Sequence, residues 1–247
     1  LYRRGSSRKS RNKLVKAEEK KEGRPVGFAF RVKDLRFRYP SSSGDILKGI
    51  SFDVREGEIF GLLGPSGAGK STTQKILVKL LEDYQGSIAY FGKDLKTLGN
   101  SYYEEVRLNF VRAMLNNPRV LFLDEVTNGL DPKNARIIKD MIAEFRDGGG
   151  TVFLTTHLMN DVEQLCDRVA FCVDGSLIEI STPRDLKLKY GKREVTVEYR
   201  EGGNLASATF PLEGIGFNEE FQRLLQTKDV ETIHSGETSM EEIFIIV

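Results

Sequence analysis

Residues 64–72 read GPSGAGKST and fit the pattern G-x-x-x-x-G-K-[ST]. An apolar run at 59–63 precedes them, as a buried strand requires, and apolar residues follow at helical spacing (Ile76, Leu77, Leu80 and Leu81). A glycine-rich turn that binds no ligand could have the same residues, but it would not need a buried strand before it and a helix after it. A strand, this loop and a helix together predict a phosphate site.

Each part of the loop has its own chemistry. Glycines let the backbone turn tightly, so that successive N–H groups and the start of the helix face phosphate oxygens. Lys70 would reach the β- and γ-phosphates of a nucleotide, and the Ser71 hydroxyl would ligate Mg²⁺. The residues predicted to bind the nucleotide are Gly64, Pro65, Ser66, Gly67, Ala68, Gly69, Lys70, Ser71 and Thr72.

Two carboxylates follow the next apolar run. Residues 120–123 form a four-residue apolar stretch typical of a buried parallel strand, and Asp124 and Glu125 come directly after it. The carboxyl ends of such strands are where α/β proteins bind ligands. Asp124 is therefore predicted to hold Mg²⁺ opposite Ser71, and Glu125 to orient or deprotonate a water molecule. Paired acids often belong only to a solvated loop, but their place after the phosphate loop favours the chemical role.

Three further residues are candidates by position. His157 ends the apolar run 151–156, at the same sheet edge, and is predicted to reach the γ-phosphate region. Asp131 precedes Pro132, a pairing typical of a helix start. Tyr39 lies about one hairpin before the phosphate loop; it is either an ordinary core or surface aromatic or a residue that stacks on adenine.

Alternating strands and helices predict an α/β fold with a parallel sheet and helices on both faces. We expect a basic, disordered leader at 1–27, a nucleotide-binding domain at 28–191 with N-terminal antiparallel β strands, and a small α+β appendage at 192–247. Within the domain, strands are expected at 28–39, 46–54, 59–63, 87–91, 120–123, 151–156, 169–173 and 177–180. Helices are expected after the phosphate loop and at 107–116, 132–146, 158–167 and 182–190; the 132–146 helix is predicted to bury Ile137, Ile138, Met141, Ile142 and Phe145.

Composition restricts the class of protein. Among 247 residues, 39% are hydrophobic and 30% charged, and no apolar run approaches the roughly 20 residues of a membrane helix. No apolar stretch of a signal peptide follows the basic N-terminus. Cys166 and Cys172 lack metal-binding spacing and are expected to be buried thiols in a reducing compartment. Residues 1–24 carry a net charge of +7 within a chain of net charge +1.

The ordered motifs resemble those of the ATP-binding subunit of an ABC transporter. In that family, 64–72 would be the Walker A loop, 120–125 the Walker B strand with the catalytic Glu125, 128–132 the D-loop with Asp131, and His157 the switch histidine. The resemblance covers about 28–190 and assigns adenine stacking to Tyr39. Residues 232–235 and 240–244 are similar to the C-terminal extension of ATPases that serve ABC-2-type exporters.

This resemblance implies ATP and Mg²⁺ as cofactors and ATP hydrolysis that drives export. It further implies transmembrane permease subunits, a second nucleotide-binding subunit, and a cytoplasmic location, peripheral on the inner face of the cell membrane. Nucleic acid is not expected as a partner. His234 receives no role.

One departure from the family bears on mechanism. Lys70 and Asp124 are only 54 positions apart, and no Q-loop glutamine or LSGGQ-like signature lies between them, although 107–115 resembles the segment after that signature. The helical subdomain is expected to be missing, with its junction near Val106 and Arg107. A non-catalytic nucleotide-binding or regulatory module is therefore one alternative. A DNA-associated ATPase is another; the basic leader favours it and the absence of coiled-coil heptads opposes it.

Overall fold

The computed structural model describes residues 27–107 and 118–246. The central element is a six-stranded sheet in the order β10-β9-β3-β8-β7-β6. All neighbouring pairs are parallel except β9 with β10. Its strands are β3 (Ile59–Leu63), β6 (Val106–Arg107), β7 (Val120–Asp124), β8 (Thr151–Thr156), β9 (Arg168–Val173) and β10 (Ser176–Ser181). Every residue of β3 and β8 is buried, which explains their continuous apolar runs.

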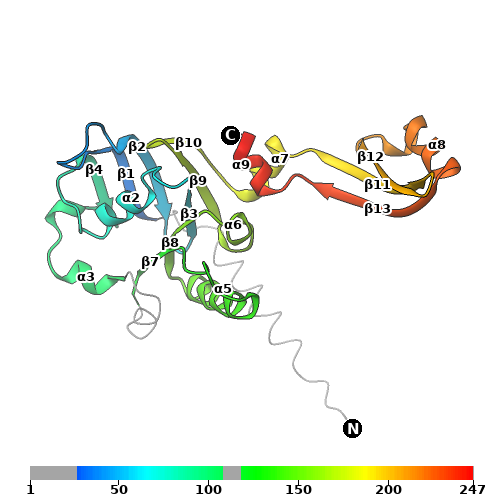
Figure 1. The fold of residues 1–247 in the computed structure, drawn as a ribbon. Coiled ribbons are helices and arrows are strands. Elements are labelled where there is room, and N and C mark those ends of the chain that lie inside the picture. The colour runs from blue at the N-terminus through cyan, green and yellow to red at the C-terminus, as the bar shows by residue number, and fades with distance from the viewer. Residues whose placement is uncertain (1–26, 108–117, 247) are drawn as a thin grey trace, which may run out of the picture.

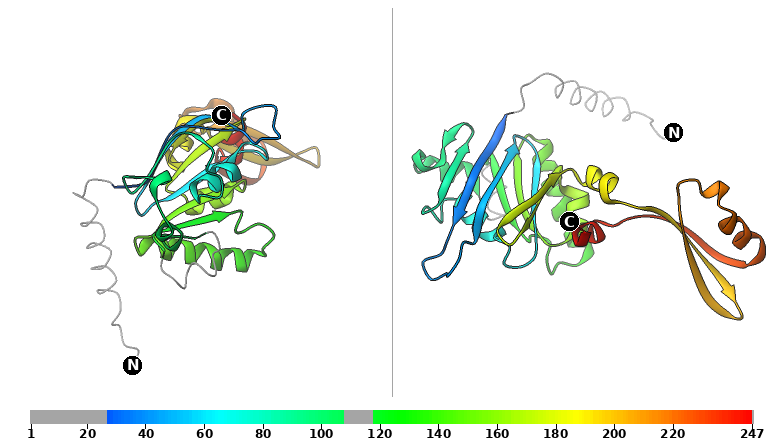
Figure 2. Two further views of the ribbon diagram at one scale, coloured as in Figure 1. Left: turned by 90° about the vertical axis from the view of Figure 1, so that its left-hand side faces the viewer. Right: turned by 90° about the horizontal axis from the view of Figure 1, so that it is seen from above.

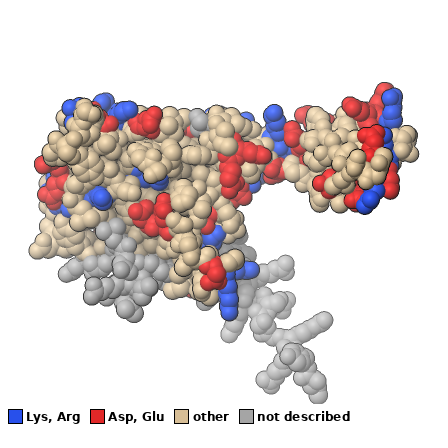
Figure 3. Space-filling model, viewed as in Figure 1, with Lys and Arg blue, Asp and Glu red and all other residues tan. Residues whose placement is uncertain are grey.

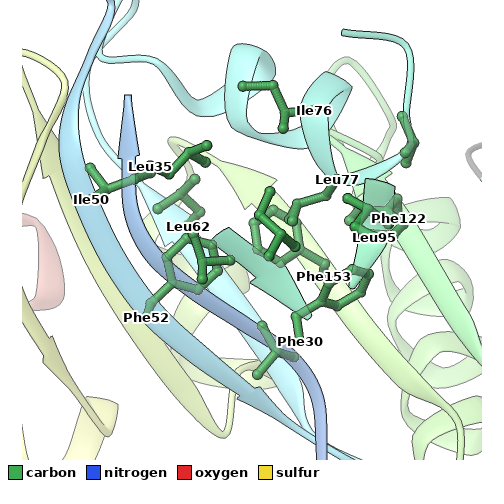
Figure 4. Close-up of a cluster of buried hydrophobic side chains, with 14 of the residues drawn as sticks. Phe30, Leu35, Ile50, Phe52, Leu62, Ile76, Leu77, Leu95, Phe122 and Phe153 are labelled. Atoms are coloured by element: carbon green, nitrogen blue, oxygen red, sulfur yellow. The ribbon is translucent and has the colours of Figure 1, made fainter. Parts of the chain in front are cut away.

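A second, antiparallel sheet covers one face of this sheet. It has the order β2-β1-β4-β5 and is formed by β1 (Phe28–Phe37), β2 (Leu47–Arg55), β4 (Gln85–Tyr90) and β5 (Lys93–Asp94). The rings of Phe52 and Phe60 stack across the interface with centroids 5.5 Å apart. Phe153 packs on both, and Figure 4 shows it beside Phe52. The helix α2 (Lys70–Leu77) lies on the same face as the antiparallel sheet.

Helices cover the opposite face. They are α5 (Pro132–Asp147), α6 (Met159–Leu165), α7 (Pro183–Tyr190) and α9 (Met240–Ile246). The predicted burial of Ile137 is wrong: its side chain is 47% exposed, while Ile142 is fully buried. Leu80 is 62% exposed because α2 ends at Leu77 and Lys79 adopts a left-handed φ of 58°.

The link from β4 to β7 is short. It contains η1 (Leu95–Thr97) and α3 (Ser101–Glu105), after which β6 pairs Val106 with Val120 and Arg107 with Leu121. Arg107 is thus a strand residue and not the start of a helix. The remainder of the helix predicted at 107–116 lies outside the described residues, as does the leader predicted at 1–27 apart from Gly27.

The C-terminal region forms a separate three-stranded sheet that extends away from the body (Figures 1 and 2). It comprises β11 (Arg193–Glu201), β12 (Asn204–Pro211) and β13 (Asp229–Glu237), with η2 (Ile215–Phe217) and α8 (Glu219–Thr227). Its small core contains Val195, Val197 and Phe210, and acidic and basic side chains are interspersed over its surface (Figure 3). The chain then returns to the body, where Phe244 of α9 packs on Phe171 with ring centroids 5.5 Å apart.

Within the described part of the chain, no helix is both long and apolar enough to cross a bilayer. Cys166 and Cys172 are buried and free, as predicted.

Glu58, just before β3, gives a test of stability against pH. Burial raises the pKa of its carboxyl above 4.5, although the Arg55 N–H and the Arg168 guanidinium oppose that shift. The contribution of Glu58 to the free energy of unfolding is therefore complete below the pKa that Glu58 has in the unfolded chain. It is lost as pH rises through the higher pKa of the folded protein. We expect Glu58→Gln to gain stability relative to the parent as pH rises through the raised pKa of Glu58. Urea unfolding of both proteins measures this; a pH-independent difference would contradict it.

Candidate nucleotide-binding site

The phosphate loop follows β3 and leads directly into α2. Gly67 and Gly69 adopt left-handed φ values of 83° and 104°, which side chains other than glycine disfavour. A Cβ atom on Gly64 would lie 2.0 Å from the carbonyl oxygen of Cys172, so the loop packs too closely on β9 to admit one. The fixed glycines of the motif are therefore required by the fold as well as by the backbone turn.

Lys70 is held inside the loop. Its Nζ donates to the carbonyl oxygens of Gly64 at 2.7 Å and Pro65 at 3.0 Å, and the residue is 8% exposed. The ammonium is thus positioned among the backbone groups that would surround a phosphate. Ala68 is buried, and its carbonyl accepts from Gly175 N at 3.1 Å and from the Cys172 thiol at 3.0 Å. Pro65 and Ala68 therefore shape the loop.

Glu125 and His157 lie in direct contact. Nδ1 of His157 is 2.8 Å from Oε1 of Glu125, and Nδ2 of Asn128 donates to Oε2 at 3.2 Å. Because an ionised carboxylate only accepts hydrogen bonds, His157 donates here. The hydrogen bond from His157 lowers the pKa of Glu125, and Asn128 and the Lys70 charge act in the same direction. Glu125 is therefore ionised at neutral pH, as a proton acceptor must be.

A cavity of about 610 Å³ joins these groups, which is a suitable size for a small ligand. Residues of the phosphate loop, Glu125, His157 and Tyr39 all line it. The lining residues are Tyr39, Ile46, Ser66, Gly67, Gly69, Lys70, Ser71, Thr72, Glu125 and His157. The structure thus brings together most of the site predicted from the sequence, and it adds Ile46.

Tyr39 is positioned by its neighbours. Its hydroxyl is 3.4 Å from Oγ1 of Thr72, and its ring meets Phe37 edge-on with centroids 4.8 Å apart. These contacts place a half-buried aromatic face at the cavity. The geometry therefore suits stacking on a planar ring.

Asp124 ends β7 beside a group of polar side chains. One carboxylate oxygen accepts from the Thr155 hydroxyl, which also lies 3.3 Å from Oε1 of the buried Gln74. With Ser71, these groups supply the hard oxygen ligands that Mg²⁺ prefers. No cluster of three or more His, Cys, Asp or Glu side chains suited to a metal occurs among the described residues.

Sequence reasoning did not assign Gln74 or Thr155 to the site. The available signal was polar: Gln74 lies in a helix that buries most of its residues, and Thr155 and Thr156 end a wholly buried strand. Asn128 lies in the segment 128–132 that the resemblance assigns to the D-loop, and the sequence predicts no contact of its side chain with Glu125. These residues act through side-chain contacts that spacing alone does not reveal.

Asp131 lies outside the cavity lining. Its carboxylate caps α5, accepting from the backbone N–H groups of Lys133 at 3.0 Å and Asn134 at 3.1 Å. These hydrogen bonds lower its pKa. The helix-start prediction is confirmed, while a contact with nucleotide stays a prediction.

The comparisons agree with this geometry. A family profile described as ABC transporter matches residues 47–106, and one described as the fluoroquinolone efflux ABC transporter C-terminal domain matches 193–237. A third profile, described as AAA domain, putative AbiEii toxin, Type IV TA system, matches 105–160. Together these matches cover residues 47–160, which include the phosphate loop, Glu125 and His157, and residues 193–237 of the appendage.

Curated relatives extend over most of the chain. A fluoroquinolones export ATP-binding protein of Mycobacterium tuberculosis is 39% identical over 277 residues, covering 88% of this chain and 92% of the relative. A lantibiotic transport ATP-binding protein of Streptococcus pyogenes is 26% identical, covering 60% of this chain and 88% of the relative. A solved ATP-binding subunit of an ABC transporter has the same fold, with a TM-score of 0.58 at 21% identity over 66% of this chain and 93% of that chain. The chain belongs to the ABC transporter ATP-binding protein family, whose members are ATPases of the P-loop type.

The alignment with the Mycobacterium protein contains a large gap on this chain's side. It runs over 277 positions, yet it includes only 88% of a 247-residue chain. The ABC transporter profile stops at 106, where the sequence predicted a junction. A missing segment between Lys70 and Asp124 stays a prediction from the sequence.

Proposed function

We propose that this chain binds Mg-ATP in the cavity beside Lys70 and hydrolyses it to drive export through separate membrane subunits. The observation that carries the proposal is the contact between Glu125 and His157 in the cavity that the phosphate loop also lines. An ionised carboxylate at that place can accept a proton from an attacking water molecule. The loop backbone and Lys70 hold the phosphates against it.

The roles divide among a few groups. Lys70 and the N–H groups at 64–72 stabilise phosphate charge, and Tyr39 stacks on the adenine ring. Ser71 and Asp124 would hold Mg²⁺, which supplies charge neutralisation at the phosphates. His157 keeps the Glu125 carboxylate ionised and oriented, and it lies where it can contact the terminal phosphate. Phosphoryl transfer depends mainly on such positioning and charge stabilisation.

The names of the relatives support a proposal on partners. Relatives are named as export or transport ATP-binding proteins, and the appendage matches a fluoroquinolone efflux C-terminal domain. We propose permease subunits, a second nucleotide-binding subunit and a place at the inner face of the cell membrane. The exported class would be small organic molecules, as the name of the Mycobacterium relative suggests for that protein.

The alignment gap favours a second candidate, a nucleotide-binding module with weak or no turnover. In the family, the missing signature segment covers the γ-phosphate of the opposing subunit. Loss of one wall of donors removes transition-state stabilisation of the kind that costs roughly 10²–10³-fold per donor. The chain as given should then bind Mg-ATP weakly and hydrolyse it slowly.

Two measurements separate the candidates. The intact mass of the protein from its source is compared with 27.8 kDa, and ATP turnover is assayed on the same preparation. A mass near that value with slow turnover would support the module, and a clearly heavier protein with steady turnover would support the transporter ATPase. If the 27.8 kDa chain hydrolysed ATP rapidly and Glu125→Gln did not slow it, both the transporter-ATPase and the weak-turnover proposals for this site would be contradicted.

A further inference from the structure

A buried ion pair lies behind the segment that carries Glu125. Nζ of Lys139 in α5 is 2.7 Å from Oδ1 of Asp161 in α6, and the two side chains are only 11% and 6% exposed. Lys139 also donates to Oε1 of Gln164 at 3.0 Å, about one turn further along α6. Because desolvation opposes charges at this depth, both need well-placed partners. The pair therefore fixes α5 against α6.

Asp161 has a second partner, outside the helices. The hydroxyl of Thr127 donates to Oδ2 of Asp161, and both residues are buried. Thr127 belongs to the segment between β7 and α5. Two backbone hydrogen bonds form turns in this segment: Asn128 N donates to Glu125 O at 3.0 Å, and Leu130 N donates to Thr127 O at 3.3 Å. One carboxylate thus joins this segment to both helices.

The two members of the Glu125–His157 contact belong to different segments. Glu125 follows β7, whereas His157 follows β8 and stands just before α6, whose first turn contains Asp161. Glu125 adopts a left-handed φ of 47°, which a residue with a side chain holds only where its surroundings impose it. Asp161 therefore connects the segment that carries Glu125 with the helix that follows His157.

We propose that Asp161 is a positioning residue for Glu125 and His157. By holding Thr127 to α6, it maintains the Glu125 backbone conformation and the 2.8 Å contact with His157. Asp161 does not line the nucleotide cavity, so it acts through the segment and not on the nucleotide. The inference rests on the proposed function, because it assigns a role in activating water to the pair that Asp161 positions.

If the Thr127–Asp161 hydrogen bond only stabilised the fold, a different result would be expected. Loss of such a tie would lower stability without altering the Glu125–His157 contact at temperatures where the protein is folded. The chain offers a control on the same helix: Glu163 pairs with Lys187 of α7 at 3.1 Å and accepts from Met240 N at 3.3 Å. Glu163→Gln therefore weakens α6 packing without touching Thr127.

The test uses imidazole ¹⁵N NMR spectra of the full chain. Only two histidines are present, so His234→Gln assigns the signals of His157. Thr127→Val removes the donor to Asp161 and leaves the Lys139–Asp161 pair in place. We expect Thr127→Val and Asp161→Asn to shift the His157 Nδ1 resonance toward its position in Glu125→Gln, and Glu163→Gln to leave it unchanged.

The outcomes are distinguishable. An unmoved His157 resonance in folded Thr127→Val, with a shift in Glu125→Gln, overturns the positioning role alone. No shift in Glu125→Gln would mean that the contact with His157 is absent, which counts against the proposed function itself. If Asp161→Asn fails to fold, Thr127→Val still decides. In turnover assays the positioning role predicts a fall in kcat of about 10-fold or more in Thr127→Val, with KM unchanged.

Discussion

Glu125→Gln should reduce ATP turnover by about 10²–10⁴-fold while nucleotide affinity changes little. Glutamine has nearly the shape of glutamate, so the cavity keeps its form, but the amide cannot take a proton from water. In the parent protein the hydrogen bond from His157 lowers the pKa of Glu125 and so keeps its carboxylate ionised. The variant removes that carboxylate.

A single-turnover assay, with protein in excess over ATP, measures this change even where turnover is slow. Glu144→Gln is the matched control, because it neutralises an exposed acid on α5 away from the nucleotide cavity. Equal rates for the parent and Glu125→Gln would show that another group accepts the proton.

Lys70→Ala should weaken ATP binding by about 10- to 100-fold, since hydrogen bonds to charged groups each contribute roughly 1.5–3 kcal/mol. Two effects combine. The phosphates lose a point charge, and the loop loses the ammonium that joins the carbonyl oxygens of Gly64 and Pro65. The loop should therefore become less ordered as well as less positive.

Fluorescent-nucleotide titration in the presence of Mg²⁺ checks this second result. Lys75→Ala removes one positive charge from an exposed position of the same helix and should leave affinity nearly unchanged. A similar loss in both variants would indicate general electrostatic attraction instead of specific binding by Lys70.

Those parts of the site that have local sequence signals could be predicted before the fold was known. The phosphate loop needs glycines at fixed places. In the structure the reasons are the left-handed φ of Gly69 and the close approach of Gly64 to β9. Glu125 and His157 were found because parallel strands end at one edge, so residues that follow apolar runs meet there.

The contacts that hold those residues in place depend on the three-dimensional fold. The antiparallel sheet packed on β3 and β8, the return of α9 to the body and the exposure of Ile137 depend on contacts between distant segments. The same holds for the hydrogen bond of Glu125 with His157, 32 positions apart, and that of Thr127 with Asp161, 34 positions apart. Periodicity and spacing report which face a residue occupies along its own segment, whereas a side-chain partner is chosen by packing, which no local pattern encodes.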